Sequence, residues 1–227
     1  MSSQSTTEVA LSTAAEISEQ LDGAGVRLET PPDTARLIVR TLRRLAEGHP
    51  FPMKEIAQLA SDLENAKEAL EFIDQMSEKD EKGNVLGHLG LSLNDHPHQL
   101  EVDGRELHAW CAWDTLFLPL FLGRPAHVTS NDPATGKEIR LTVSPDRVER
   151  SQPEHIVVSV VVPDVEEGHT WTAEQAQVLF CNFIHFFADA KAASQWFAER
   201  NMPVSFLTVE DAVELGRIRF KEIIAQS

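Results

Sequence analysis

The sequence predicts an α+β protein, with an N-terminal winged helix-turn-helix-like module followed by a mixed, mainly antiparallel β core with flanking helices. Two patterns lead to this prediction. Apolar residues recur at helical spacing through residues 33–76, whereas residues 94–227 contain several short β-branched runs separated by turn signals. The chain has 227 residues, of which 42% are hydrophobic, so it can bury a substantial core.

Residues 1–32 are expected to form a flexible N-terminal extension. This segment is rich in Ser and Thr and then reaches Gly23, Gly25, Pro31 and Pro32, which disfavour regular structure. Order is therefore predicted to begin only near Asp33. A short helix over residues 11–21 is the alternative.

Residues 33–93 are predicted to form the first domain, made of three helices and a hairpin. The first helix begins with a cap at Asp33 or Thr34 and ends before Gly48 and Pro50. The second follows Pro52, and the third carries apolar residues on one face. The predicted ranges are 33–47, 53–60 and 63–76 for the helices and 79–93 for the hairpin.

Three helices and a β hairpin in this order suggest a winged helix-turn-helix, a common DNA-binding module. The charges argue against that function. Residues 33–76 contain six basic residues against eight acidic ones, and the would-be recognition helix carries four acids opposed only by Lys67. Phosphates would repel such a helix, so the module is predicted not to bind DNA.

Residues 94–227 are predicted to form a catalytic α+β domain. Asp103-Gly104 is the signal of a two-residue hairpin turn, and Asp189 is a helix cap. Pro119 is expected to kink or end a helix that contains Cys111. The predicted strands cover residues 99–102, 105–108, 126–130, 137–143 and 155–162, the apolar run 178–187 includes Cys181, and the last helices cover 189–200 and 209–225.

The balance of charge excludes several classes of partner. There are 36 acidic and 20 basic residues, which gives a formal net charge of −16. Such a chain is repelled by phosphate backbones and anionic lipid surfaces, so neither nucleic acid nor a membrane is expected as a partner. The sequence has no run of 18 apolar residues and its start lacks the layout of a secretory signal, so we expect a cytoplasmic protein.

Two cysteines, Cys111 and Cys181, are the most informative residues. They lie 70 positions apart and are expected to be free thiols in a reducing compartment. In the run Trp110-Cys111-Ala112-Trp113-Asp114, a helix would place Cys111 and Asp114 on one face, while the tryptophans and Phe117 exclude water. A position near the helix start would lower the thiol pKa. The pattern suggests a soft nucleophile beside a proton donor.

Other interpretations of these residues are simpler. Buried free cysteines are most often inert small hydrophobes, and an isolated aspartate is usually a surface acid or a helix cap. His185 follows Cys181 by four residues, but the ligand spacing of a structural zinc site is missing. We assign Trp171 to the core, and residues 165–177 to an exposed loop or short helix.

The motifs around both cysteines closely resemble the bacterial organomercurial lyases, also called alkylmercury lyases. The resemblance covers roughly residues 34–220. Asn182 stands where members of that family often carry an additional cysteine, which leaves Cys181 as the only distal candidate. The matching segments are Leu107-His108-Ala109-Trp110-Cys111-Ala112-Trp113-Asp114-Thr115-Leu116, Leu122-Gly123-Arg124, Ala134-Thr135-Gly136, Leu141-Thr142-Val143-Ser144-Pro145, Phe180-Cys181 and His185-Phe186-Phe187.

The resemblance implies that Cys111, Cys181 and Asp114 carry catalysis and bind mercury, and that the N-terminal module does not bind DNA. The reaction that the resemblance implies is protonolysis of a carbon–mercury bond, which gives a hydrocarbon and Hg(II). Thiolates suit this soft metal. Asp114 at its usual pKa would be only ~0.1% protonated near pH 7, so keeping its proton needs ~4 kcal/mol from burial and nearby thiolates. In an alternative route, Asp114 takes a cysteine proton as mercury binds and then passes it to carbon.

The resemblance also implies the partners. No organic cofactor is expected, low-molecular-weight thiols deliver the organomercurial substrate, and thiols or a mercuric reductase accept the Hg(II) product. Two hypotheses from other classes remain open at this stage. One is a soft-metal sensor or carrier without lyase activity, and the other is a redox switch that joins Cys111 to Cys181.

Overall fold

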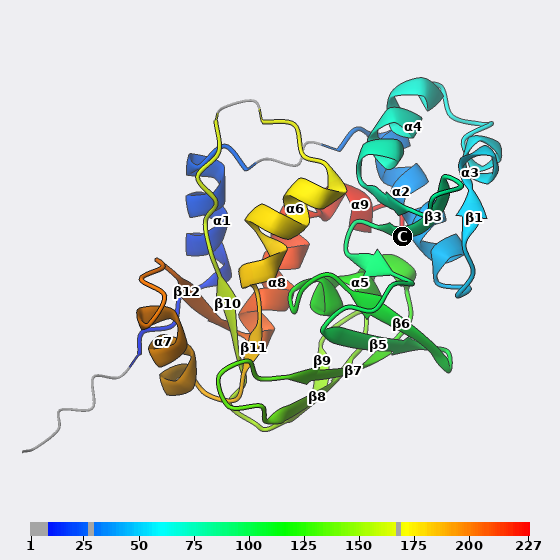
Figure 1. Ribbon diagram of the computed structural model, residues 1–227. Coiled ribbons are helices and arrows are strands. Elements are labelled where there is room, and N and C mark those ends of the chain that lie inside the picture. The colour runs from blue at the N-terminus through cyan, green and yellow to red at the C-terminus, as the bar shows by residue number, and fades with distance from the viewer. Residues whose placement is uncertain (1–8, 27–29, 167–168) are drawn as a thin grey trace, which may run out of the picture.

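The computed structural model describes residues 9–26, 30–166 and 169–227, and it shows an α+β fold with antiparallel sheets (Figure 1). The helices are α1 (Ala14–Gly23), α2 (Pro32–Leu45), α3 (Met53–Leu59), α4 (Ala66–Gln75), α5 (Asp114–Leu122), α6 (Ala173–Leu179), α7 (Ala190–Ala198), α8 (Val209–Arg219) and α9 (Lys221–Ile224), with a 3-10 turn, η1 (Cys181–Phe183). The strands are β1 (Phe51–Pro52), β2 (Ser77–Lys79), β3 (Asn84–His88), β4 (Leu91–Ser92), β5 (His98–Val102), β6 (Arg105–Ala109), β7 (Ala126–Asn131), β8 (Glu138–Val143), β9 (Val148–Gln152), β10 (Val157–Val160), β11 (Phe186–Phe187) and β12 (Ser205–Thr208).

Two antiparallel sheets organise the described residues. The larger has the strand order β1-β3-β4-β6-β5-β7-β8-β9, with β2 paired to β3, and the smaller has the order β11-β10-β12. The β5–β6 hairpin turns at Asp103-Gly104, as predicted, and both residues have positive φ, at 51° and 72°. The predicted pairing of residues 126–130 with 137–143 is confirmed as β7 against β8.

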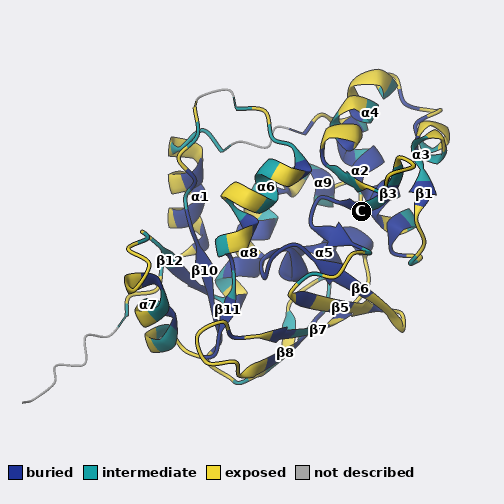
Figure 2. Ribbon diagram, viewed as in Figure 1, coloured by how far each residue is buried: buried dark blue, intermediate teal, exposed yellow. Residues whose placement is uncertain are grey.

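The larger sheet continues through the boundary that the sequence predicts at residue 93. Strand β4 lies before this boundary and β6 after it, and they pair through Leu91–Ala109 and Ser92–His108. One hydrophobic cluster also joins side chains from every helix except α7, whose buried residues belong to a second, smaller cluster. Figure 2 shows this core as the dark interior between the sheet and the helices. The predicted first domain therefore shares a sheet and a hydrophobic core with the remainder of the chain.

The expectation that order begins only near Asp33 is wrong for residues 14–23. These residues form α1, whose start is fixed by a capping box in which Thr13 and Glu16 bond each other's backbone N–H groups. Ile17 and Leu21 are buried, and the helix lies beside α8 (Figure 1). The sequence alone does not show that α8 covers the apolar residues of α1, because the two helices lie near opposite ends of the chain. The remainder of the predicted extension, residues 1–8 and 27–29, lies outside the described residues.

Other predicted elements agree with the structure to within a few residues. Helices α2, α3 and α4, the β2–β3 hairpin, and the Asp189 cap of α7 all appear. Helix α5, however, continues past Pro119 to Leu122 and is capped by Gly123, which has a φ of 66°. Among the described residues, none of the helices is long and apolar enough to cross a membrane.

Two buried histidines predict a loss of stability in acid. His88 and His98 are almost fully buried, and desolvation lowers the pKa of each from 6.5 to about 3. Both are therefore neutral in the folded protein, whereas an unfolded chain would protonate them below pH 6.5. The contribution of these two neutral histidines to stability is fully present above pH 6.5 and is lost as the pH falls towards 3. At pH 5 each histidine is expected to lower the free energy of unfolding by ~2 kcal/mol.

Denaturant unfolding between pH 7.5 and 4.5 checks this expectation. His98→Asn should unfold with a shallower pH dependence than the wild type, and the exposed His127→Asn serves as the control with an unchanged slope. Equal slopes for wild type and His98→Asn would contradict it.

Candidate active site

Cys111 lies in a loop between β6 and α5, and not in the helix that the sequence predicts. Its backbone N–H donates to Oδ2 of Asp114 at 2.8 Å. The next N–H, of Ala112, donates to the carbonyl of Ile184 at 3.1 Å. Helix α5 begins only at Asp114, three residues after Cys111. The predicted proximity of Cys111 and Asp114 is confirmed, but a side-chain-to-backbone hydrogen bond produces it.

Asp114 is the first residue of α5 and is buried. The turn between β3 and β4 packs against its carboxyl group. A Cβ atom on Gly90 would lie 2.5 Å from Cγ of Asp114, and Gly90 also has a φ of 94°, which L side chains rarely adopt. Glycine at this position allows the backbone to approach the carboxyl group closely.

Cys181 begins the turn η1, directly after α6 and Phe180. The chain that follows is held firmly. The Ser159 hydroxyl donates to the carbonyl of Phe183 at 2.8 Å and accepts from the N–H of His185 at 2.9 Å. Together with the bond from Ala112 to Ile184, these contacts bring the Cys181 turn next to the Cys111 loop.

The three predicted site residues meet in space. The sulfurs of Cys111 and Cys181 and a carboxylate oxygen of Asp114 all lie within 4.8 Å of one another. Among the described residues this is the one His/Cys/Asp/Glu cluster with the geometry to hold a metal ion, so the histidines near Cys181 contribute no ligand. One soft cation can contact both sulfurs here.

The thiols are held in the protonated form, contrary to the prediction for Cys111. Burial raises the pKa of Cys111 well above its usual value, and the neighbouring Cys181 and Asp114 raise it further. For Cys181, the hydrogen bond with Cys111 lowers the pKa, but burial and the charge of Asp114 outweigh it, and the net direction is upward. A helix start does not offset this desolvation, because Cys111 lies outside α5.

Asp114 titrates in the range where it can carry a proton. Burial raises its pKa from 3.8 to about 6, even though hydrogen bonds from Cys111 and the charge of His96 act in the opposite direction. At neutral pH the resting cluster therefore holds a mostly ionised carboxylate beside two neutral thiols. The three groups are close enough to titrate as a coupled set.

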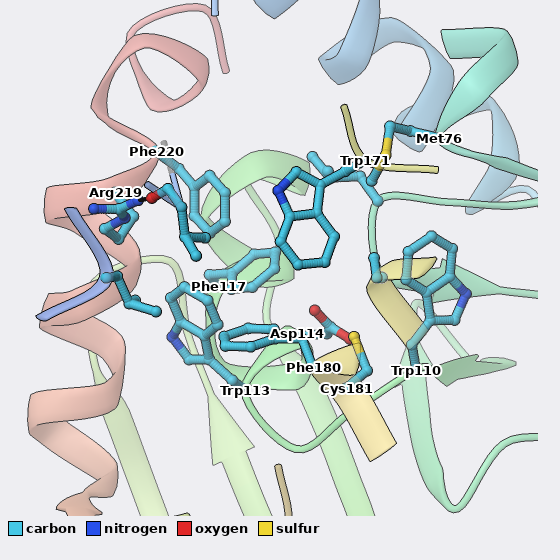
Figure 3. A pocket seen from close by; sticks show the side chains of 15 residues that line it. Met76, Trp110, Trp113, Asp114, Phe117, Trp171, Phe180, Cys181, Arg219 and Phe220 are labelled. Carbon is cyan, nitrogen blue, oxygen red and sulfur yellow. Dashed lines mark hydrogen bonds between the residues drawn. The ribbon is translucent and has the colours of Figure 1, made fainter. Parts of the chain in front are cut away.

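A cavity of about 120 Å³ opens onto this cluster (Figure 3). Asp114 and Cys181 line it, whereas Cys111 is not among the lining residues and is 1% exposed. Figure 3 shows the Asp114 carboxyl group and the Cys181 sulfur together at the floor of the cavity, surrounded by rings. The remaining lining residues are Leu21, Val26, Met76, Leu89, Gly90, Trp110, Trp113, Phe117, Trp171, Ala176, Phe180, Arg219 and Phe220.

The sequence prediction missed several parts of this cavity. Trp171, which was assigned to the core, lines the cavity and is only partly buried. Arg219 was not singled out. Its guanidinium contacts the carboxylate of Asp22 at 2.5 Å and donates to the carbonyl oxygen of Val26, so it ties α1 and the residues after it to α8. These residues come from distant segments, and only folding shows that they share one wall.

Comparison with known proteins identifies the family. The sequence model of the alkylmercury lyases, MerB, matches residues 91–221, which is more than half of the chain. The chain belongs to the alkylmercury lyase family. The resemblance drawn from the motifs is thereby confirmed. The matched range contains all three residues of the buried cluster. Five residues of the cavity wall precede it, namely Leu21, Val26, Met76, Leu89 and Gly90.

Individual relatives cover most of this lyase-family chain. It is 45% identical to the alkylmercury lyase of Staphylococcus epidermidis over 179 residues, which is 78% of this chain and 77% of the relative. It is 35% identical to the alkylmercury lyase of Pseudomonas putida over 205 residues, which is 87% of this chain and 89% of the relative. The crystal structure of the mercury-bound form of MerB2 has the same fold, with a TM-score of 0.71, 22% identity, and coverage of 92% of this chain and 99% of that one.

Proposed function

We propose that this member of the family cleaves carbon–mercury bonds by protonolysis at Cys111, Cys181 and Asp114. One observation carries the proposal, namely that two neutral thiols and a carboxylate converge within 4.8 Å beside an apolar cavity. The thiols match the softness of mercury, the carboxylate can move a proton, and the rings accommodate an organic group.

The groups of the cluster balance the reaction without an external acid. A substrate R–Hg–SR′ and two cysteine thiols give R–H, R′–SH and Hg(II) held by two cysteine sulfurs. As each Hg–S bond forms, its thiol loses a proton. One proton goes to the departing thiol R′–SH and the other to carbon, as the C–Hg bond breaks and a C–H bond forms.

Asp114 is proposed to carry the proton between sulfur and carbon. Its carboxylate is mostly ionised at pH 7, so it accepts a thiol proton once mercury makes that thiol acidic. Burial makes the protonated acid less unfavourable than it is for a carboxyl group in water, and the acid then passes its proton to the mercury-bound carbon. This is the second of the two routes considered from the sequence.

The surrounding conditions follow from the same chemistry. No organic cofactor is needed, and low-molecular-weight thiols are the proposed carriers of substrate and acceptors of Hg(II), with a mercuric reductase as a further acceptor. Free thiols at the site suit a reducing cytoplasm.

We further infer that α2, α3, α4 and the β2–β3 hairpin form a winged-helix-like module without DNA binding. The helix order fits, whereas the acidic residues of α4 oppose phosphate. This charge also disfavours a sensor whose winged helix contacts DNA.

The proposal is tested by product analysis. Phenylmercury is incubated with the protein and excess thiol, and the benzene released is measured by gas chromatography. One benzene is expected per phenylmercury, at a rate well above that of the same thiol without protein. Mercury bound to the protein without benzene above that background would refute lyase activity and favour a carrier.

A further inference from the structure

A half-buried carboxylate outside the cavity links the turn beside Asp114 to the helix that precedes Cys181. Glu78 lies on β2, and its side chain is 12% exposed. Oε1 accepts from Nε2 of His96 at 3.1 Å and from Nε2 of Gln177 at 2.8 Å. Oε2 accepts from the Ser92 hydroxyl and from Nδ2 of Asn94 at 3.2 Å. Three separate segments of the chain therefore meet at one carboxylate.

The pocket that holds Glu78 is shaped for it. A Cβ atom on Gly87 of β3 would lie 2.3 Å from Oε2 of Glu78, so the carboxylate occupies the space that a side chain would fill. Burial raises the pKa of Glu78, but the hydrogen bonds, first that of His96, outweigh it and hold the pKa below its usual value. Glu78 is thus a charged acceptor, and hydrogen bonds to a charged acceptor are the stronger ones.

On one side, Glu78 supports the turn that covers Asp114. Ser92 pairs with Gly87 across β3 and β4, and the tight turn between these strands brings Gly90 against the Asp114 carboxyl group. The carbonyl of Gly90 also accepts from the N–H of Trp110 at 2.9 Å, directly beside Cys111. The carboxylate of Glu78 therefore contacts both strands that hold this turn, β3 at Gly87 and β4 at Ser92.

On the other side, Glu78 holds the helix that precedes Cys181. Gln177 is on α6, four residues before Cys181. Within the described part of the chain, the side-chain hydrogen bonds of α6 are its own capping box and the bond from Gln177 to Glu78. The hydrogen bonds of Ser159 hold the chain after Cys181, and the hydrogen bond from Gln177 to Glu78 holds the chain before it.

We propose that Glu78 is a positioning residue which, through Gln177, holds Cys181 at the distance from Cys111 and Asp114 that lets one mercury atom contact both sulfurs. Glu78 does not line the cavity and touches none of the reacting groups. This inference rests on the proposed function, because it assumes that both thiols bind mercury.

Gln177→Ala is the sharpest test, because it removes the link to Cys181 and leaves the remaining partners of Glu78 in place. Glu174→Ala is the matched control, since it removes an exposed polar side chain from the same helix. The kcat for phenylmercury cleavage is expected to fall ~10–100-fold in Gln177→Ala, the range seen when a group supporting a metal ligand is lost. Glu174→Ala should stay within about twofold of the wild type.

Two further readouts separate positioning from a purely structural role. The ultraviolet charge-transfer band of Hg(II) bound by two thiolates, recorded with one equivalent of Hg(II), should weaken in Gln177→Ala while its Tm stays close to that of Glu174→Ala. In addition, the double variant Glu78→Ala/Gln177→Ala should lose no more kcat than Glu78→Ala, because both changes break one link.

The outcomes distinguish the two proposals. A wild-type protein that releases no benzene would refute the proposed function. An active wild type, with Gln177→Ala matching Glu174→Ala in kcat and in the charge-transfer band, would overturn the positioning role alone. A Gln177→Ala variant that loses Tm but retains kcat would also overturn it, because Glu78 would then serve stability.

Discussion

Replacing either cysteine by serine is expected to abolish hydrocarbon release, but the two variants should fail at different steps. Cys181 lines the cavity and Cys111 lies behind it, 1% exposed. Cys181→Ser should therefore fail to capture an organomercurial efficiently. Cys111→Ser should still capture it through Cys181 yet leave the C–Hg bond intact, because the second sulfur is missing.

Mass spectrometry of the protein after brief exposure to phenylmercury separates these two steps. An intact phenylmercury adduct should accumulate on Cys111→Ser and remain much less populated on Cys181→Ser. Affinity for Hg(II) in competition with a small dithiol should fall by at least ~100-fold in both, which is the upper end of the effect of losing only a supporting group. Benzene release at the wild-type rate by either variant would show that one thiol suffices.

Asp114→Asn is expected to separate mercury binding from bond cleavage. The amide oxygen of asparagine can still accept from the N–H of Cys111, so the loop should keep its shape. Both thiols remain, and Hg(II) binding should survive. The amide cannot carry a proton, so kcat should fall by ~10²–10⁴-fold, the usual contribution of general acid–base catalysis.

Stability provides the control for this variant. The pKa of Asp114 is raised from 3.8 to about 6, so the ionised carboxylate destabilises the folded protein by ~3 kcal/mol above pH 6. Asp114→Asn removes this cost, and denaturant unfolding at pH 7.5 should show that it is at least as stable as the wild type. A less stable Asp114→Asn variant would contradict the raised pKa.

The pH dependence of the wild type tests the proposed direction of proton transfer. A carboxylate that must first accept a thiol proton works only while ionised, so kcat/KM should be retained above pH 6 and decline below it. A direct donor would show the opposite trend, with a rate that rises as the pH falls towards 6. Asp114→Asn should lack this titration.

The proposed catalytic residues can be identified from the sequence because their chemical types are scarce. With two cysteines in 227 residues, there was a single candidate for each thiol, and the motif around Cys111 brought Asp114 with it. The helices and strands of the first half were also readable, since their apolar spacing is regular. The backbone conformation around Cys111 could not be predicted in the same way. Cys111 was placed in a helix, because spacing alone does not show that Ala112 bonds to Ile184, 72 positions away.

Sequence motifs and apolar periodicity therefore sufficed to predict the family and the α+β class and to propose the reacting groups, because these depend on residue types and local spacing. Only the tertiary structure decided the features that depend on contacts between residues far apart in the sequence. The tertiary structure places α1 against the cavity and brings Trp171 and Arg219 into the cavity wall. It also joins Glu78 to Gln177, which is 99 positions away in the sequence. It also reverses the expected shift in the pKa of Cys111, since desolvation depends on what surrounds the thiol in three dimensions.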